Sequence, residues 1–313
     1  MLSVSCVNCK EMRKIQITSY HIRKRKSLAA LSGTIRIAVL ADVHNSRAAG
    51  KTGELPELIC RACPDAVFCC GDILTEKAGI AKTENALCLM QDLAGRYPVY
   101  YVNGNHESRI ISDPERYGKA AAFYFEALEA YGVRFLNNDS CLASFGGCTV
   151  RICGYEAPLG YYSRTAPVRF DGKDPKRVLT GMPVGKDDNN GFVQDRFFTV
   201  WLAHHPDLFP AYAAAGADLV LSGHVHGGMV RLPAAGGLIG ASLKPLPPYD
   251  KGRFVIPKDP EDQKPYRRSF PRKKYGDVCT ERECEMIVSA GLGDHTIPLR
   301  FNNPTELVML EIG

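Results

Sequence analysis

Two histidines separated by one residue, His224 and His226, follow a short apolar run that begins at Leu219. On an extended backbone, residues two apart point the same way and lie roughly 7 Å apart. A histidine nitrogen binds a metal at about 2 Å, and paired catalytic ions lie about 3.5–4 Å apart. Two histidines on one face can therefore each hold a different ion of a pair. Taken alone, the pattern also fits a polar strand end in which a histidine is only hydrogen-bonded.

Four other apolar runs end in residue types that bind metals. The clusters are Asp42-x-His44 after residues 35–41, Gly71-Asp72 after 66–70, Gly104-Asn105-His106 after 98–102, and His204-His205 after 197–203. In open α/β sheets the residues beyond the carboxyl ends of the strands lie together. Any one cluster fits an ordinary turn, whereas five clusters that each follow a predicted strand predict one metal site.

The elements that must position these clusters alternate between strands and helices. The apolar periodicity predicts helices at about 54–63, 83–93, 118–131 and 208–215, and further strands at 15–22, 133–136, 141–145, 149–154, 286–289 and 306–310. Gly146 and Gly147 predict a hairpin turn. The segments 158–194 and 246–280 lack periodicity and predict long loops. We expect a lead-in over residues 1–34 and a single domain over 35–313.

The composition favours a folded chain with a sizeable core over a disordered or membrane-spanning chain. Of the 313 residues 45% are hydrophobic, and the net charge of +5 is only a mild bias toward anionic partners. No apolar run approaches the ~18–20 residues that span a bilayer, and no apolar signal segment follows the basic residues near the N-terminus. The basic residues 23–26 leave peripheral contact with a membrane surface open.

The twelve cysteines have no regular spacing. We interpret them as mostly reduced thiols, which predicts a cytoplasmic protein. The pairs Cys6-x-x-Cys9 and Cys60-x-x-Cys63 leave a shared structural zinc open.

The order of the five clusters resembles the motif order of the calcineurin-like metallophosphoesterase superfamily, which is matched from about residue 35 to residue 228. The segments 223–233, 289–293 and 298–300 also look like the bacterial subgroup named after the YkuE and YaeI phosphodiesterases. The resemblance implies an α/β fold with two packed mixed β-sheets flanked by helices. It also implies a dinuclear site at the carboxyl ends of the strands.

The resemblance further implies how the ligands divide between the two ions. The first ion would take Asp42, His44, Asp72 and His226, and the second would take Asp72, Asn105, His204 and His224. Asp72 would bridge the ions, a role that suits a carboxylate with its two oxygens. His204 is favoured over His205 because the family ligand directly follows the strand.

His106 directly follows a predicted ligand, so we place it at the rim of the site. The resemblance implies a general acid or a transition-state stabiliser at the leaving-group oxygen. The alternative is a histidine that only orients a neighbouring ligand.

We therefore expect a dinuclear phosphoesterase that hydrolyses a phosphomonoester, phosphodiester or pyrophosphate bond by in-line attack of metal-bound hydroxide. Nitrogen and oxygen ligands without thiolate fit Mn, Fe, Zn or Ni. The expected substrate is a phosphorylated small molecule or a lipid phosphate. The basic segment 251–274 leaves a nuclease as the alternative. A non-catalytic metal-binding scaffold is less favoured, because none of the motif ligands is missing.

Overall fold

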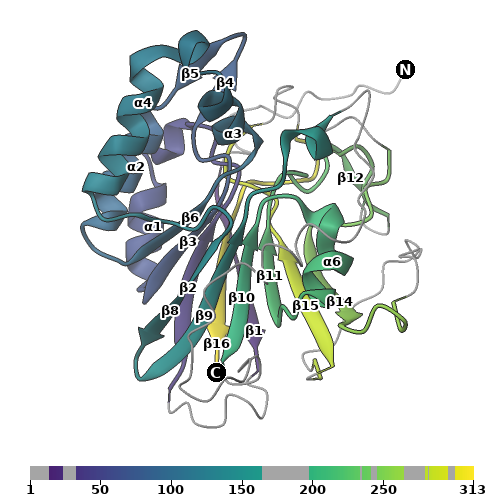
Figure 1. The fold of residues 1–313 in the computed structure, drawn as a ribbon. Coiled ribbons are helices and arrows are strands. Elements are labelled where there is room, and N and C mark those ends of the chain that lie inside the picture. The colour runs from purple at the N-terminus through teal and green to yellow at the C-terminus, as the bar shows by residue number, and fades with distance from the viewer. Residues whose placement is uncertain are drawn as a thin grey trace, which may run out of the picture.

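Two six-stranded β-sheets pack face to face in the computed structural model, and helices cover the outer face of each sheet (Figure 1). The structure describes residues 14–23, 33–163, 197–232, 235–240, 245–263, 279–280, 282–294 and 300–313. The expected α/β architecture, with two packed mixed sheets between helices, is confirmed. Within these ranges no helix is both long and apolar enough to cross a membrane.

The first sheet contains the strands that carry Asp42, Asp72 and Asn105 at their carboxyl ends. Its order is β1 (Gln16–Ile22), β16 (Glu306–Ile312), β2 (Ile35–Leu40), β3 (Ala66–Cys70), β6 (Val99–Val102) and β7 (Arg134–Phe135). The strands from β2 to β7 are parallel, β16 is antiparallel to β2, and β1 is parallel to β16. The strand expected in the lead-in is therefore present, and it forms an edge of this sheet.

The second sheet carries three candidate histidine ligands, His204, His224 and His226, beyond the ends of its strands. Its order is β14 (Gly252–Pro257), β15 (Glu283–Val288), β11 (Leu219–Ser222), β10 (Phe198–Ala203), β9 (Cys148–Tyr155) and β8 (Asp139–Phe145). The central four strands are parallel and the two edge strands are antiparallel to their neighbours. A turn at Gly146 and Gly147 joins β8 to β9, as expected.

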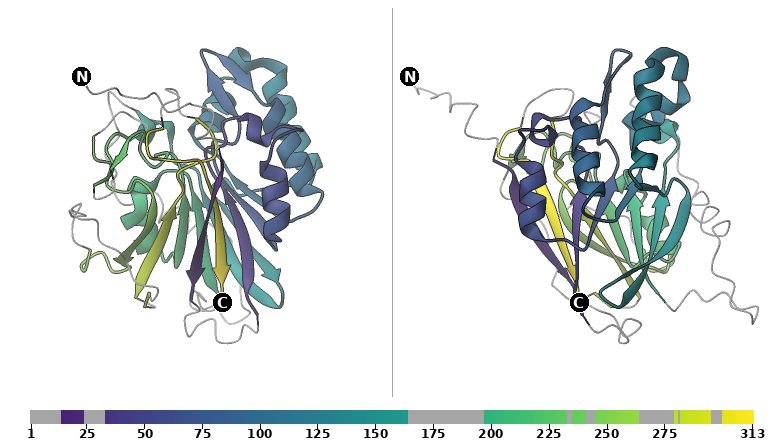
Figure 2. Two further views of the ribbon diagram at one scale, coloured as in Figure 1. Left: turned by 180° about the vertical axis from the view of Figure 1, so that it is seen from behind. Right: turned by 90° about the vertical axis from the view of Figure 1, so that its left-hand side faces the viewer.

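The helices pack on the outer faces, as both views in Figure 2 show from other directions. The first sheet is covered by η3 (Arg47–Ala49), α1 (Leu55–Ala62), α2 (Glu84–Ala94), α3 (Asn105–Ser112) and α4 (Pro114–Ala130). The second is covered by η4 (Leu159–Tyr162), η5 (Pro206–Leu208) and α6 (Phe209–Ala214). Every residue of β3, β10 and β11 is buried, which explains why these strands read as continuous apolar runs.

Side chains alternate between two apolar layers along each inner strand. On β2, Ile37 and Val39 face the core between the sheets, whereas Ala38 and Leu40 face the helices. This two-sided burial fixes the register of the strand, because a slip of one residue would exchange the two faces. The register in turn fixes where the carboxyl end of each strand delivers its polar residue.

Two predicted segments differ from the structure. The segment 246–280, expected as a loop, contains β14, which pairs with β15 along its whole length. Arg253 makes this possible, because its charge is paired with Glu285 of β15 at 2.7 Å. The helix expected at 118–131 begins at Pro114, behind the N-cap Asp113, and is interrupted where Gly118 takes a φ of 68°.

Other structure was not predicted. A short hairpin, β4 (Thr75–Lys77) and β5 (Ile80–Lys82), follows the Gly-Asp cluster, and β12 (Arg231–Leu232) pairs with β13 (Gly236–Gly237) after the last histidine. From the loop expected at 158–194, residues 159–162 form η4, and residues 164–196 lie outside the described residues. The ten described cysteines are free thiols, and Cys6 and Cys9 lie outside the described residues.

Candidate metal-binding active site

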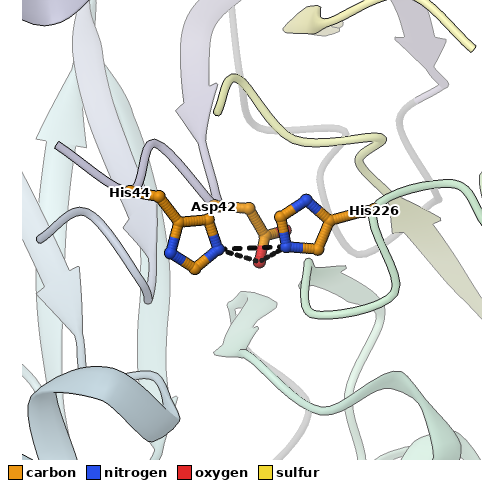
Figure 3. A group of neighbouring side chains, drawn as sticks. All are labelled: Asp42, His44 and His226. Carbon is orange, nitrogen blue, oxygen red and sulfur yellow. Dashed lines mark hydrogen bonds and ion pairs between the residues drawn. The ribbon is translucent and has the colours of Figure 1, made fainter. Parts of the chain in front are cut away.

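Asp42 and His44 follow β2 of the first sheet and meet His226, which follows β11 of the second sheet (Figure 3). The Nε2 atoms of His44 and His226 lie 3.0 Å apart. Asp42 Oδ1 lies 3.4 Å from His226 Nε2 and 3.8 Å from His44 Nε2. Three electron-pair donors from two sheets thus converge on one point, and their rings and carboxylate are almost fully buried.

A second group joins Asp72, His204 and His224. Asp72 Oδ2 lies 3.1 Å from His204 Nε2. The other ring nitrogen of His204, Nδ1, lies 2.7 Å from the carbonyl oxygen of Cys70, to which it can only donate. When the ring is neutral, Nε2 therefore presents its lone pair to the site, beside the Asp72 carboxylate.

Asp72 also belongs to a third group, with His44 and His106. Its Oδ2 lies 3.9 Å from the Nε2 atoms of both histidines. Its Oδ1 accepts a hydrogen bond from the backbone N–H of His106 at 2.9 Å. One carboxylate oxygen is thus held by the main chain, and the other faces ligands of both groups.

The backbone at these positions takes a conformation that non-glycine residues rarely adopt. Five candidate ligands have a positive φ: Asp42 (51°), His44 (48°), Asp72 (55°), His224 (70°) and His226 (52°). Such residues are uncommon elsewhere and gather at functional sites, where the surrounding structure holds the strain.

The positive φ values correct the argument made from the spacing of His224 and His226. The extended backbone assumed there is wrong, because β11 ends at Ser222 and both histidines lie in the turn beyond it. The turn is fixed by the backbone N–H of His224, which donates to both oxygens of Asp42 at 2.9 and 3.1 Å. The two rings still reach different groups of ligands.

Close approach of the main chain explains two of the glycines in the motifs. A Cβ on Gly223 would lie 2.6 Å from Asp42 Oδ2, and a Cβ on Gly71, whose φ is 83°, would lie 2.6 Å from the backbone of Gly104. Both positions exclude a side chain, so the clusters can pack as tightly as the ligand distances require.

Asn105 opens helix α3 and faces His224. Its side-chain amide lies 3.0 Å from His224 Nδ1, to which its NH₂ group can donate. In this orientation the amide oxygen accepts from Arg109 and from the backbone N–H of His106, both at 3.3 Å.

His106 has a defined tautomer when neutral. Its Nδ1 accepts a hydrogen bond from the backbone N–H of Glu76 on β4 at 3.0 Å, so its proton lies on Nε2, the nitrogen that faces Asp72. Burial lowers the pKa of His106, which favours this neutral form. The ring also packs edge-on against His44, with 4.8 Å between centroids.

Glu107 is a residue of the site that the sequence reasoning left without a role. Its buried carboxylate accepts hydrogen bonds from the backbone N–H groups of Asp72 (2.8 Å), Ile73 (2.8 Å) and Gly104 (3.0 Å), and from the hydroxyl of Tyr101 (2.7 Å). It therefore joins the loops after β3 and β6. The sequence signal that could have revealed this role is an acidic residue directly after the Gly-Asn-His cluster. Burial raises the pKa of Glu107 to about 7.

The charges of the site act strongly on one another because they are out of water. Burial raises the pKa of Asp42 to about 7, and the nearby His204 opposes the rise. For Asp72, burial also favours the neutral form, but His204, His106 and His44 outweigh it and hold its pKa well below the usual range. Burial lowers the pKa of His204, whereas Asp72 raises it more, to about 9.

Two predicted histidines differ in their surroundings. His204 belongs to a ligand group, whereas His205 is the N-cap of η5, accepts from the N–H of Asp207 and lies 3.3 Å from the carbonyl oxygen of Tyr161. Among the described residues His205 takes part in no group that could hold an ion.

The donor set fits divalent cations. Two ligands of one ion at about 2.1 Å lie about 3.0 Å apart at a right angle and about 3.4 Å apart at a tetrahedral angle. The separations of 3.0 Å for His44 and His226, 3.4 Å for Asp42 and His226, and 3.1 Å for Asp72 and His204 fall in this range.

Comparison with known proteins agrees with this chemistry. The model of the family described as calcineurin-like phosphoesterase matches residues 35–228. The chain belongs to the calcineurin-like phosphoesterase family. It is therefore a metal-dependent phosphoester hydrolase.

Two curated relatives of this phosphoesterase carry metallophosphoesterase names. One is the uncharacterized metallophosphoesterase YkuE of Bacillus subtilis (strain 168), 26% identical over 80% of this chain and 68% of the relative. The other is the putative metallophosphoesterase F40B5.2 of Caenorhabditis elegans, 26% identical over 66% of this chain and 39% of the relative. The expected likeness to the YkuE subgroup is confirmed.

Among solved structures, the NAD nucleotidase NadN of Haemophilus influenzae is similar with a TM-score of 0.44 and 10% identity, over 84% of this chain and 46% of that chain. The chain thus spans less than half the length of NadN and of the nematode relative.

Proposed function

We propose that this phosphoesterase holds two divalent ions and hydrolyses a phosphomonoester, phosphodiester or pyrophosphate bond. The observation that carries the proposal is the position of Asp72 Oδ2, which lies 3.1 Å from His204 on one side and 3.9 Å from His44 on the other. When bound, the ions would neutralise phosphoryl oxygens and lower the pKa of a shared water, which supplies the attacking hydroxide.

The proposed ligand sets follow the groups of converging donors. Asp42, His44 and His226 would hold the first ion, His204, His224 and Asn105 would hold the second, and Asp72 would serve both. The structure supports a bridge through the single oxygen Oδ2, because Oδ1 is occupied by the backbone N–H of His106. This differs from the expectation that both oxygens of the carboxylate serve as ligands.

We assign His106 the role of proton donor to the leaving-group oxygen. The backbone N–H of Glu76 keeps the His106 proton on Nε2, and burial keeps the ring neutral, so a donor N–H points toward the reacting centre. Only 14% of the His106 side chain is exposed, which excludes most competing water.

Metal identity and substrate belong to the proposal as well. The imidazole, carboxylate and amide donors suit Mn, Fe, Zn or Ni. A phosphorylated small molecule or a lipid phosphate is the proposed substrate, with a phosphodiester as the preferred ester on the likeness to the YkuE subgroup. The catalytic unit is proposed to be one domain over residues 35–313, with β1 as an added edge strand.

The described part of the basic segment does not favour a nuclease. Lys251 pairs with Glu306 at 2.9 Å, Arg253 with Glu285 at 2.7 Å, and Lys258 with Asp218 at 2.5 Å. These cations neutralise acids of the fold instead of forming a free surface for phosphates. The remaining basic residues of the segment, at 264–274, lie outside the described residues.

The decisive experiment compares metal content with turnover for the wild type and Asp72→Asn. We expect about two equivalents of metal in the wild type, and loss of both metal and activity in the variant. The panel of substrates should include phosphomonoesters, phosphodiesters, pyrophosphate, lipid phosphates and DNA. Full metal content with normal turnover in Asp72→Asn would show that Asp72 does not bridge the ions. If DNA were the one substrate hydrolysed, with a turnover that falls as salt is added, the result would favour a nuclease.

A further inference from the structure

A pocket of about 100 Å³ opens beside the second group of candidate ligands. It reaches His224 at one side and is otherwise formed by the end of η4, by His205, and by Gly240 with the segment 245–248. A single water needs about 10–15 Å³ of such space, so the pocket has room for a small organic group. A complete ligand usually needs several times this volume, which indicates a subsite for one part of a substrate.

The chemistry of the wall indicates what that part is. One side consists of Val225, Pro245, Pro247 and Pro248, which offer apolar surface and no side-chain hydrogen bonds. Among the described residues no lysine or arginine lines the pocket, and its one carboxylate, Asp207, is exposed. The other lining side chains, Tyr161, Tyr162, Ser163, His205 and His224, are polar but carry no permanent positive charge, so the apolar side favours a compact apolar group over a second phosphate.

Tyr162 supplies a polar group at the boundary between this pocket and the ligands. Its ring meets that of His224 edge-on at 4.9 Å between centroids. The side chain is only 7% exposed, and within the described residues its hydroxyl has no hydrogen-bond partner. The carboxylates of Asp72 and Glu156 are close enough to act on this hydroxyl electrostatically. A buried hydroxyl without a partner is costly, and a bound oxygen acceptor would remove that cost.

We propose that this pocket receives a compact apolar group of the phosphate ester, and that the Tyr162 hydroxyl donates a hydrogen bond to an oxygen of the bound phosphoryl group. The substrate class is then an aryl or short alkyl ester rather than a pyrophosphate or polyphosphate. This inference rests on the proposed function, since the pocket is a subsite of the same metal centre.

The test uses two non-hydrolysable probes, phenylphosphonate and methylphosphonate, and measures their binding to the Mn²⁺-supplied protein by calorimetry. Both present the same anionic head group, and only phenylphosphonate fills the pocket. We expect phenylphosphonate to bind the wild type about 10-fold more tightly or better.

Gly240→Val fills the pocket with little strain. A Cβ at Gly240 would lie 3.4 Å from Pro247 and 3.6 Å from Val225, which are ordinary contacts. We expect this variant to weaken phenylphosphonate about 10-fold and to leave methylphosphonate within about 2-fold. The matched control is Gly95→Val at the end of α2, where an added Cβ also meets only ordinary contacts and both probes should bind as in the wild type.

Tyr162→Phe keeps the ring and removes only the hydroxyl. We expect both probes to bind about 10-fold more weakly, because the lost hydrogen bond goes to the common anionic head group. Tyr100→Phe is the control, since Tyr100 packs against Phe68 and Phe145 at the core between the sheets. This control also removes one tyrosine hydroxyl, and both probes should bind to it as they bind to the wild type.

The outcomes separate the subsite from the metal centre. Equal binding of the two probes to the wild type, or equal effects of Gly240→Val on both, would overturn the subsite and leave the metal centre standing. Unchanged binding in Tyr162→Phe would overturn the role of the hydroxyl. Binding of neither probe to the metal-supplied wild type would overturn the proposed function together with the subsite.

Discussion

His204, at the end of a strand in the second sheet, lies with its Nδ1 2.7 Å from the main-chain oxygen of Cys70, at the end of a strand in the first sheet. The contact turns the opposite nitrogen of the ring toward Asp72, only two residues beyond Cys70. The strand that supplies one ligand therefore also orients a ligand from the other sheet, as a partner of a metal-binding histidine is expected to do.

His204→Ala should remove one of the two ions. The loss should exceed the roughly 10–100-fold weaker metal binding that follows when only an orienting partner is removed. Metal content after dialysis measures the effect, and His21→Ala, on the exposed side of β1, is the control. Two retained ions in His204→Ala would show that this ring is not a ligand.

Asp42→Asn should change stability in opposite directions with and without metal. The pKa of Asp42 is raised in the folded protein from 3.8 to about 7. A carboxyl group whose pKa is higher in the folded than in the unfolded protein stabilises the fold at a pH below its unfolded pKa, and this stabilisation is lost as the pH rises to its folded pKa. The asparagine variant has no such group. In the absence of metal, its free energy of unfolding relative to that of the wild type should therefore rise by up to about 4 kcal/mol from pH 4 to pH 7.

Urea unfolding of the metal-free proteins at several pH values measures this gain. With Mn²⁺ present the variant should instead be less stable than the wild type, because it binds metal less well. A stability difference that does not vary with pH in the metal-free proteins would contradict the assigned ionisation of Asp42.

Glu107→Gln should destabilise the fold although it replaces none of the candidate ligand side chains. The amide would turn an NH₂ group toward some of the five donors that now bind the carboxylate, leaving buried groups unpaired at a cost of about 1–3 kcal/mol. The free energy of unfolding in urea measures the loss. Glu115→Gln, in the exposed first turn of α4, should stay within about 0.5 kcal/mol of the wild type.

His106→Ala should retain the metals and slow turnover by about 10²–10⁴. The loss should be greatest for esters with poor leaving groups, which need the donated proton most. Turnover across a series of phenyl phosphates with different substituents measures this dependence. A uniform loss over the series would instead assign His106 an orienting role.

The continuous apolar runs predicted β2, β3 and β10 well, because a strand that is buried on both faces consists almost entirely of apolar residues. β14 was not predicted, because charged residues lie within it and next to it. Arg253 and Lys251 look like residues of a solvated loop until the partners Glu285 and Glu306, supplied by other strands, neutralise them. A sequence shows the charge but not its distant partner.

The same limit applies to the site. The motif order identified the residues that converge. The spacing of His224 and His226, however, suggested an extended backbone, whereas the structure has a turn there. That turn is held by Asp42, which is distant in the sequence. The support of His106 by Glu76 was likewise beyond prediction, because it uses a backbone N–H of a hairpin with no apolar periodicity.

Two of the three groups of candidate ligands take residues from both sheets, so an ion held in either of them cross-links the two layers at one end of their shared core. Metal binding and the packing of the sheets are then one equilibrium. A substitution deep between the sheets, such as one at Ile37 or Val200, should weaken metal affinity from a distance. A chelator should, in the same way, loosen the whole sandwich rather than a single loop.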